Sequence, residues 1–168
     1  MNEWYNGEGD RMNNIYERLN TFLWSHPTYK KVVGFLTIAL KYIMMASYVM
    51  LLIGFYITHD DYLIYAIIKP CAAFLIVTVI RKLINQSRPY DYLEVTPLLE
   101  HCEGCSFPSR HAASAFIIAL TAIHFDLYIG IVMLIFAFLT AITRVLSGLH
   151  HISDVVAGMV LSLIIELL

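Results

Sequence analysis

The sequence contains few charged residues for its length. Only 14% of its 168 residues are Asp, Glu, Lys or Arg, whereas 59% are hydrophobic, and the net charge is −2. This composition excludes an ordinary small soluble domain and indicates one compact membrane domain that covers residues 1–168. The sequence also lacks an arginine-rich run interleaved with aromatic residues, so we do not expect nucleic acid as a partner.

Cysteine is scarce as well, and the three thiols are Cys71, Cys102 and Cys105. They are too few for a disulfide framework. The pattern Cys102-x2-Cys105 after His101 is a weak zinc signal because no further ligands follow at suitable spacing, so we predict no metal and no other cofactor. A disulfide that braces this loop and a pair of free thiols both remain open, and the redox compartment decides between them.

The first 30 residues lack the features of a cleavable signal peptide. Glu3, Glu8 and Asp10 precede any apolar run, so we expect membrane insertion to depend on the internal apolar segments. From 10 to 24, apolar residues recur at helical spacing, which predicts an amphipathic helix within residues 1–30. Such a helix lies on the bilayer surface or packs over the end of the bundle, and the pattern fits both arrangements.

Five apolar segments are candidates for membrane-spanning helices, because a hydrocarbon core of roughly 30 Å requires about 20 helical residues. Their approximate ranges are 31–58, 62–85, 110–124, 127–144 and 152–168. Lys41 interrupts the first segment and Lys69-Pro70 the second. We interpret Lys69 as snorkelling to the membrane surface and Lys41 as snorkelling or facing the bundle. A functional role for Lys41 is the alternative. The sequence therefore predicts an all-α integral membrane bundle with about five transmembrane helices plus the N-terminal amphipathic helix.

Polar residues gather where these segments begin and end. They are Arg81, Lys82 and Arg88 after the second segment, Ser109, Arg110 and His111 at the start of the third, Arg144 at the end of the fourth, and His150 and Asp154 at the start of the fifth. Counting the crossings places all of them at one membrane face. Because independently placed segments agree, we predict a functional site at this face.

The most informative of these residues are His150 and Asp154. They are four positions apart, so in a helix that begins at His150 after Gly148 the carboxylate can fix the imidazole tautomer. An oriented, electron-rich imidazole is a nucleophile. Arg144 offers a permanently charged guanidinium that suits phosphate or carboxylate. Ser109, as an N-cap, leaves helix-start amides that attract anions.

Three motifs together resemble the signature of the PAP2 family, the type 2 phosphatidic acid phosphatases related to vanadium haloperoxidases. They are Arg81-x6-Arg88-Pro89, Pro108-Ser109-Arg110-His111 and Thr143-Arg144-x5-His150-x3-Asp154. Departures from the usual family residues occur at Arg81, Arg110 and Thr143, where lysine, glycine and serine are common. We favour Arg81 for the first position because seven residues return a helix to nearly the face of Arg88, and Lys82 is the alternative. Membrane members of the family typically have six spans, whereas this sequence offers five.

The resemblance implies a mechanism. His150 is then the nucleophile that forms a phosphohistidine, Asp154 orients it, and His111 is the general acid and later activates water. The residues that hold the phosphate are then Arg81, Arg88, Ser109, Arg110 and Arg144. No metal is required. Spacing to Arg144 and Asp154 selects His150 over its neighbour His151, which we interpret as structural.

From the resemblance we predict an enzyme that hydrolyses a membrane lipid phosphate or diphosphate. Undecaprenyl diphosphate is the leading substrate by family analogy, with phosphatidylglycerophosphate and phosphatidic acid as alternatives. A lipid phosphotransferase and a non-catalytic binder or flippase of lipid phosphates remain open. The sequence does not predict the oligomeric state.

The membrane side of the site is indicated by two opposing arguments. Basic residues outside the motifs lie on the site face and are Arg11, Arg18, Lys30 and Lys31, so the positive-inside rule places the site in the cytoplasm. Membrane members of the PAP2 family generally place it outside. We therefore predict a multi-pass protein of the cell membrane and favour an extracytoplasmic site.

Overall fold

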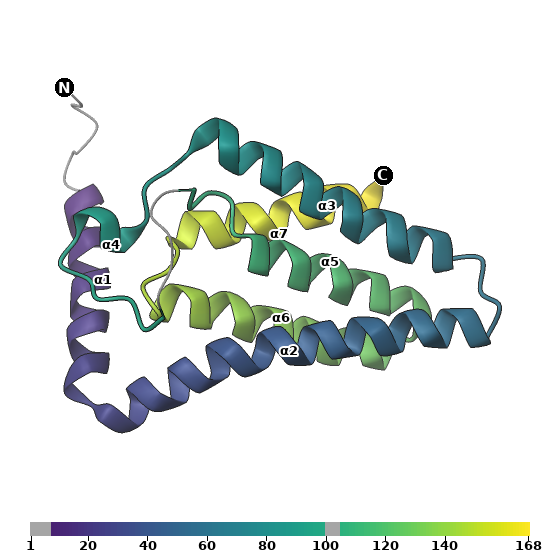
Figure 1. The fold of residues 1–168 in the computed structure, drawn as a ribbon, viewed down its shortest axis with the longest axis horizontal. Coiled ribbons are helices and arrows are strands. Elements are labelled where there is room, and N and C mark those ends of the chain that lie inside the picture. The colour runs from purple at the N-terminus through teal and green to yellow at the C-terminus, as the bar shows by residue number, and fades with distance from the viewer. Residues whose placement is uncertain (1–7, 100–104) are drawn as a thin grey trace.

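A computed structural model of the protein describes residues 8–99 and 105–168. These residues form helices and no β-strand, which confirms the predicted all-α bundle. The helices are α1 (Glu8–Ser25), α2 (Pro27–Ile57), α3 (Leu63–Ile84), α4 (Pro89–Tyr92), α5 (Arg110–Phe125), α6 (Leu127–Leu146) and α7 (Ile152–Leu167). In Figure 1 the long helices α2, α3, α5, α6 and α7 run lengthwise, and α1 lies across one end of them.

Three stretches of the described chain are long and apolar enough to cross a bilayer, namely Pro27–Ile57, Leu63–Tyr92 and Leu127–Leu146. α5 and α7 have 16 residues each. At a rise of 1.5 Å per residue, such a helix is about 24 Å long, which is less than the roughly 30 Å of a hydrocarbon core. The chain is a helical membrane bundle, and five crossings stay a prediction.

α5 is the central helix of the bundle. It packs against α2, α3, α6 and α7. Its buried residues lie on several sides of the helix, including Ala112, Ala113, Ala115 and Ile117. A helix that is apolar all round belongs in the interior, and small side chains allow its neighbours to approach closely. The first residues of α5 therefore lie among the ends of the surrounding helices.

α5 and α7 approach each other closely at Gly158. A Cβ atom there would lie 2.8 Å from Ser109 O and 3.1 Å from Ala113 N. One turn later, Ser162 Oγ donates a hydrogen bond to Ala113 O over 2.8 Å. Small residues thus hold the two helices together, which fixes the start of α7 relative to the start of α5.

The amphipathic helix α1 is docked on the end of the bundle, which is one of the two predicted arrangements. Tyr16 and Asn20 are buried. The hydroxyl of Tyr16 accepts a hydrogen bond from the backbone N–H of Ile152 over 2.7 Å. Asn20 exchanges two hydrogen bonds with the backbone of Thr96, over 2.8 and 3.0 Å. α1 therefore covers the first turn of α7 and the loop after α4.

Candidate active site

The turn between α6 and α7 carries His150. α6 ends at Leu146, and Gly148, with a φ of 72°, turns the chain in the left-handed region that favours glycine. The next helix begins at Ile152, as the predicted range 152–168 has it, and not at His150, the start that the spacing argument assumed. The pairing is nevertheless present, because His150 Nδ1 lies 3.3 Å from Asp154 Oδ2 and both side chains are buried.

Burial keeps His150 neutral. When Nδ1–H donates to Asp154, the lone pair of the ring is on Nε2, and no described residue forms a hydrogen bond with that atom. Burial lowers the pKa of His150 to about 4, although the Asp154 carboxylate raises it, and the charges of Arg88 and Arg81 lower it further. The ring is therefore unprotonated at neutral pH, which is the nucleophilic form.

Asp154 is held by further donors. Ser106 Oγ donates to Asp154 Oδ2, and the backbone N–H of His151 donates to the same oxygen over 2.9 Å. Ser106 is fully buried, and its own N–H donates to Gln86 O over 2.8 Å. These hydrogen bonds fix the carboxylate in the position that orients His150.

His151 contacts the same carboxylate but is engaged at both ring nitrogens. Nδ1 lies 3.3 Å from Asp154 Oδ2, and Nε2 lies 2.8 Å from the hydroxyl of Tyr92. The ring of Tyr16 packs edge-on, with 5.9 Å between the centroids. His151 therefore joins α1, α4 and α7, which agrees with the structural role predicted for it.

Two adjacent basic residues of α3 differ in their surroundings. Arg81 is buried, and its Nη1 donates to Ser106 O over 3.2 Å and to Pro108 O over 3.0 Å. Lys82 is exposed. The structure thus brings Arg81, and not Lys82, to the loop that precedes α5.

Arg88 and Arg144 are also buried, and both bind backbone carbonyls. Arg88 Nη1 donates to Leu149 O over 3.0 Å, and Arg144 Nη2 donates to Thr37 O over 3.3 Å. Nε of Arg144 is buried without a hydrogen-bond partner among the described residues. A buried donor without an acceptor costs free energy, which a bound oxyanion would recover.

The arginines lie close enough for their charges to act on one another. Arg88 and Arg110 repel Arg81, Arg88 repels Arg144, and Asp154 attracts Arg81. The hydrogen bonds of Arg81 and Arg144 to backbone carbonyls leave the positive charge of these two residues in place, because a carbonyl carries no net charge. The predicted residues of α3, α5, α6 and α7 therefore share one environment with an excess of positive charge, which suits an anion.

The start of α5 contributes Ser109, Arg110 and His111. Ser109 is the predicted N-cap, and its buried hydroxyl accepts from Ala112 N over 3.4 Å. The backbone N–H of Ser109 donates to Asp154 O over 2.9 Å, so the start of α5 lies against the first turn of α7. Arg110 is exposed and His111 is half-buried.

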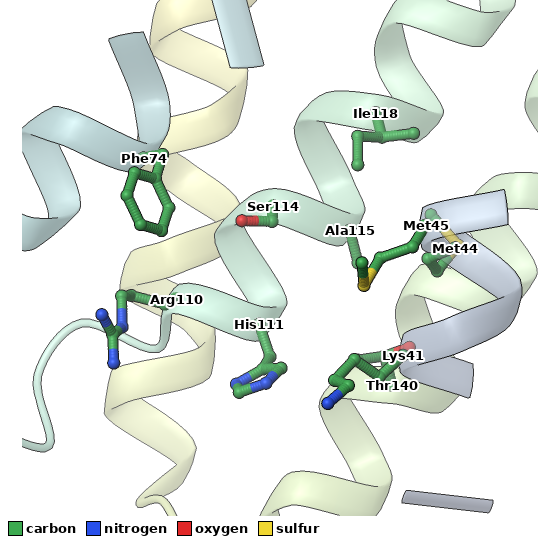
Figure 2. Close-up of a pocket in the computed structure, with 10 residues that line it drawn as sticks. All are labelled: Lys41, Met44, Met45, Phe74, Arg110, His111, Ser114, Ala115, Ile118 and Thr140. Atoms are coloured by element: carbon green, nitrogen blue, oxygen red, sulfur yellow. The ribbon is translucent and has the colours of Figure 1, made fainter. Parts of the chain in front are cut away.

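Arg110 and His111 line a pocket of about 290 Å³ between α2, α3, α5 and α6 (Figure 2). Lys41 is the third charged or titratable residue in its lining. Most of the remaining wall is apolar and consists of Met44, Met45, Phe74, Ala115 and Ile118. The pocket is therefore amphipathic, and it gives Arg110 and His111 access to a ligand that carries both a charged and an apolar part.

Sequence reasoning missed two polar residues of this region, Thr37 and Ser106, and gave a functional role for Lys41 as the alternative. Thr37 binds Arg144 through its carbonyl, and its Oγ1 lies 3.0 Å from Ser147 Oγ. Lys41 was interpreted as snorkelling or facing the bundle, and it lines the pocket. Thr37 and Lys41 are four positions apart in an apolar segment, so a polar stripe at helical spacing was the available signal. Ser106 lies in an irregular loop, where no periodicity marks it.

The metal and disulfide predictions fall partly outside the described residues, because His101 and Cys102 lie there. Cys105 has a free thiol, whose Sγ donates to Asn85 Oδ1 over 3.2 Å. In residues 8–99 and 105–168, no group of three or more His, Cys, Asp or Glu residues is arranged to hold a metal ion. Metal independence stays a prediction.

Comparison with known proteins gives two similar sequences and a family. A family model described as the PAP2 superfamily matches residues 61–168. The undecaprenyl-diphosphatase BcrC of Bacillus subtilis (strain 168) is 31% identical over 107 residues, which are 64% of this chain and 55% of that protein. The bacitracin transport permease protein BcrC of Bacillus licheniformis is 33% identical over 102 residues, 60% of this chain and 50% of that protein. The chain thus spans about half the length of these curated relatives.

Two solved structures are similar over most of the chain. The crystal structure of Aquifex aeolicus LpxE has a TM-score of 0.74 at 25% identity. The match covers 92% of this chain and 91% of the LpxE chain. The second is the first transmembrane PAP2 type phosphatidylglycerolphosphate phosphatase from Bacillus subtilis, with a TM-score of 0.75 at 19% identity. This match covers 98% of this chain and 85% of the phosphatase chain. At this identity the second likeness concerns the fold alone.

Proposed function

Because this chain belongs to the PAP2 superfamily, we propose that it is a membrane lipid phosphatase that works through a phosphohistidine at His150. One observation carries the proposal. A buried, neutral imidazole is oriented by Asp154, its Nε2 is left available, and the charges of Arg81 and Arg88 act on it. Arg81 and Arg144 donate to uncharged carbonyls. Such a set can bind a phosphate group and attack its phosphorus.

The reaction has two steps. In the first, His150 Nε2 attacks phosphorus, the P–O bond to the leaving group breaks, and the electron pair of that bond goes to the departing oxygen. His111, as general acid, gives this oxygen a proton. In the second step, water attacks phosphorus, His111 takes a proton from the water, and the N–P bond breaks. Inorganic phosphate leaves and His150 returns to its neutral form.

The arginines hold the transferring group. Arg81, Arg88 and Arg144, together with Ser109 and Arg110 at the start of α5, bind the phosphoryl oxygens that do not take part in bond exchange. Charge on these oxygens must be stabilised in the transition state, and preorganised cations do so without reorganisation at the moment of reaction. The arginines supply this charge, so we propose that the reaction is independent of metal ions.

Undecaprenyl diphosphate is the substrate that we propose. The support is the identity of 31% to a protein named undecaprenyl-diphosphatase, although that match covers 55% of the relative. The alternative, phosphatidylglycerophosphate, has weaker support, because the phosphatase that acts on it is related by fold at 19% identity. Phosphatidic acid is a third candidate by family resemblance.

The test is phosphate release by the purified protein from a panel of lipid phosphates, with and without EDTA. We expect turnover of a polyprenyl diphosphate that EDTA does not reduce. Loss of turnover in EDTA that zinc or magnesium restores would overturn metal independence. A lipid phosphotransferase would require an added acceptor for turnover, and a non-catalytic binder would bind the lipids without releasing phosphate.

We further propose that the site faces away from the cytoplasm, on the strength of the family resemblance. The test uses a chain without native cysteines and an impermeant maleimide on intact cells. Glu94→Cys is exposed at the site end, and we expect it to be labelled. Asp61→Cys is exposed in the turn between α2 and α3, at the opposite end, and serves as the control. Labelling of Asp61→Cys alone would place the site in the cytoplasm.

A further inference from the structure

Lys41 is a cation in the middle of the apolar helix α2, and it is half-buried. Its side chain lines the pocket next to the start of α5. Figure 2 shows its ammonium group directed towards the ring of His111, from the opposite wall. A charged residue within a membrane span is costly, so its presence there indicates a ligand or a partner.

The described residues offer Lys41 no carboxylate. None of their ion pairs involves it. The contact that its ammonium group makes is with the ring of Tyr42, whose centroid lies 4.5 Å away. A cation–π contact of this kind leaves the positive charge of the ammonium group unbalanced. An anion in the pocket would balance it.

The part of the pocket that Lys41 and Thr140 line lies one helical turn further into the bundle than Arg144. Thr37, whose carbonyl binds Arg144, precedes Lys41 by one helical turn on α2. Thr140, which also lines the pocket, precedes Arg144 by one turn on α6. Because α2 and α6 pack together, the pair Lys41 and Thr140 lies about 6 Å deeper in the bundle than the pair Thr37 and Arg144.

The role proposed for His111 indicates which part of the substrate occupies the pocket. In the proposed reaction His111 protonates the departing oxygen, so the pocket that His111 lines receives the leaving group. The apolar wall formed by Met44, Met45, Phe74, Ala115 and Ile118 suits the first part of a hydrocarbon chain. Lys41, which lies opposite His111, is therefore close to the substrate atoms that follow the departing oxygen.

We propose that Lys41 binds the second phosphate of a lipid diphosphate, the one that stays on the lipid, and that it makes the enzyme prefer diphosphates to monophosphates. This inference rests on the proposed function. When His150 attacks the terminal phosphorus, the bond from that phosphorus to the bridging oxygen breaks, and the electron pair goes to the lipid monophosphate that leaves. Lys41 neutralises the charge of this group. In a monophosphate ester, carbon follows the departing oxygen, and Lys41 has no anion to bind.

The experiment compares two substrates with the same chain, a polyprenyl diphosphate and the corresponding monophosphate. Wild type should have the higher kcat/KM on the diphosphate. Lys41→Met keeps the length of the side chain and removes the charge. It should lower kcat/KM about 10- to 100-fold on the diphosphate and leave the monophosphate within about two-fold, because only the former loses a charge-assisted contact. Lys41→Arg should restore most of the diphosphate activity.

Inhibition provides a second measurement on the same proteins. Inorganic diphosphate should inhibit Lys41→Met more weakly than wild type, whereas inhibition by inorganic phosphate should be unchanged. Lys31→Met is the matched control, because Lys31 is an exposed lysine of the same helix. If Lys41→Met does not fold, Lys41→Gln gives the same comparison with a polar side chain.

Equal losses on the two substrates, or no loss on either, would overturn the inference while the phosphatase function stands. A wild type that prefers the monophosphate would overturn it as well. Turnover of neither lipid by wild type would instead remove the proposed function, and the inference with it.

Discussion

The two ends of the bundle hold their buried charges in different ways (Figure 1). At the end away from α1, Glu166 Oε1 accepts from Tyr62 OH over 2.7 Å, from Lys69 Nζ over 3.2 Å and from His124 Nε2 over 2.9 Å. This carboxylate joins α3, α5 and α7. At the end that α1 covers, the three buried arginines donate to backbone carbonyls instead.

The difference separates a structural cluster from a ligand site. Lys69 has an opposite charge beside it, so its pairing needs nothing from outside the protein. That Lys69 snorkels to the membrane surface stays a prediction. Arg81 and Arg144 are oriented by neutral acceptors and keep their charge, which suits a bound anion. The type of partner, rather than the presence of a buried charge, distinguishes the two roles.

The largest effect should come from removing the nucleophile. We expect His150→Asn to lower kcat by about 10⁴-fold or more, because no other group can take the phosphoryl group. His111→Gln should lower kcat less for a substrate with a good leaving group than for a substrate with a poor one. The measurement is phosphate release with circular dichroism as the check on folding. A His150→Asn variant within a few-fold of wild type would contradict the mechanism.

A matched pair of substitutions at the two ends tests the comparison directly. Arg144→Lys keeps the charge but loses the planar guanidinium, and we expect kcat/KM to fall by about 10²-fold while folding is retained. Glu166→Gln should instead lower the free energy of unfolding by about 1–3 kcal/mol and change kcat/KM little. The measurements are kinetics and thermal unfolding in detergent. Similar activity losses in both variants would mean that the two ends do not differ in role.

The packing of α5 on α7 should affect activity without any change in chemistry. Gly158→Ala places a Cβ atom 2.8 Å from Ser109 O, so α7 must move away from the start of α5. We expect kcat to fall about 10-fold or more, since small displacements of catalytic groups are costly. Gly34→Ala is the control, because its Cβ meets no atom within 4 Å. Equal activity of the two variants would show that this contact does not position the site.

The smallest effect concerns pH. Burial lowers the pKa of His150 to about 4, below the ordinary 6.5. Between these values the unfolded chain binds a proton that the folded chain does not, so His150 makes the protein less stable as the pH falls from about 6.5 to about 4. His150→Gln removes this contribution. The Tm of wild type minus that of His150→Gln should therefore decrease as the pH falls from about 6.5 to about 4. A constant difference would contradict the burial argument.

Most of the fold could be predicted from hydrophobic runs. α6 occupies 127–146 against a predicted 127–144, and α3 occupies 63–84 against 62–85. Lipid-facing helices must be apolar and their ends polar, so their boundaries can be predicted from the sequence. The number of crossings could not be decided, because α5 and α7 are packed in the bundle and a run of 16 residues does not distinguish a short span from a buried helix.

The candidate site was predictable only where motifs mark it. The residues of the three motifs come from separate helices, and the structure brings Arg81, Arg88, Arg144, His150 and Asp154 together. α7 begins at Ile152, as predicted, and not at His150, because Asp154 also accepts from the backbone N–H of His151, which makes His151 the N-cap. Ser106 and Thr37 act partly through backbone carbonyls, and their contribution depends on the folded chain rather than on residue type.

The covalent intermediate at His150 is the most direct test. Purified protein is mixed with a polyprenyl diphosphate, quenched in base within the first turnover, digested and analysed by mass spectrometry, because phosphohistidine survives in base. We predict a phosphoryl group on His150 and on no other residue, and its absence in His150→Asn. Phosphate release in the first turnover without a phosphoryl group on His150, or with one on His111 or His151, would contradict the account.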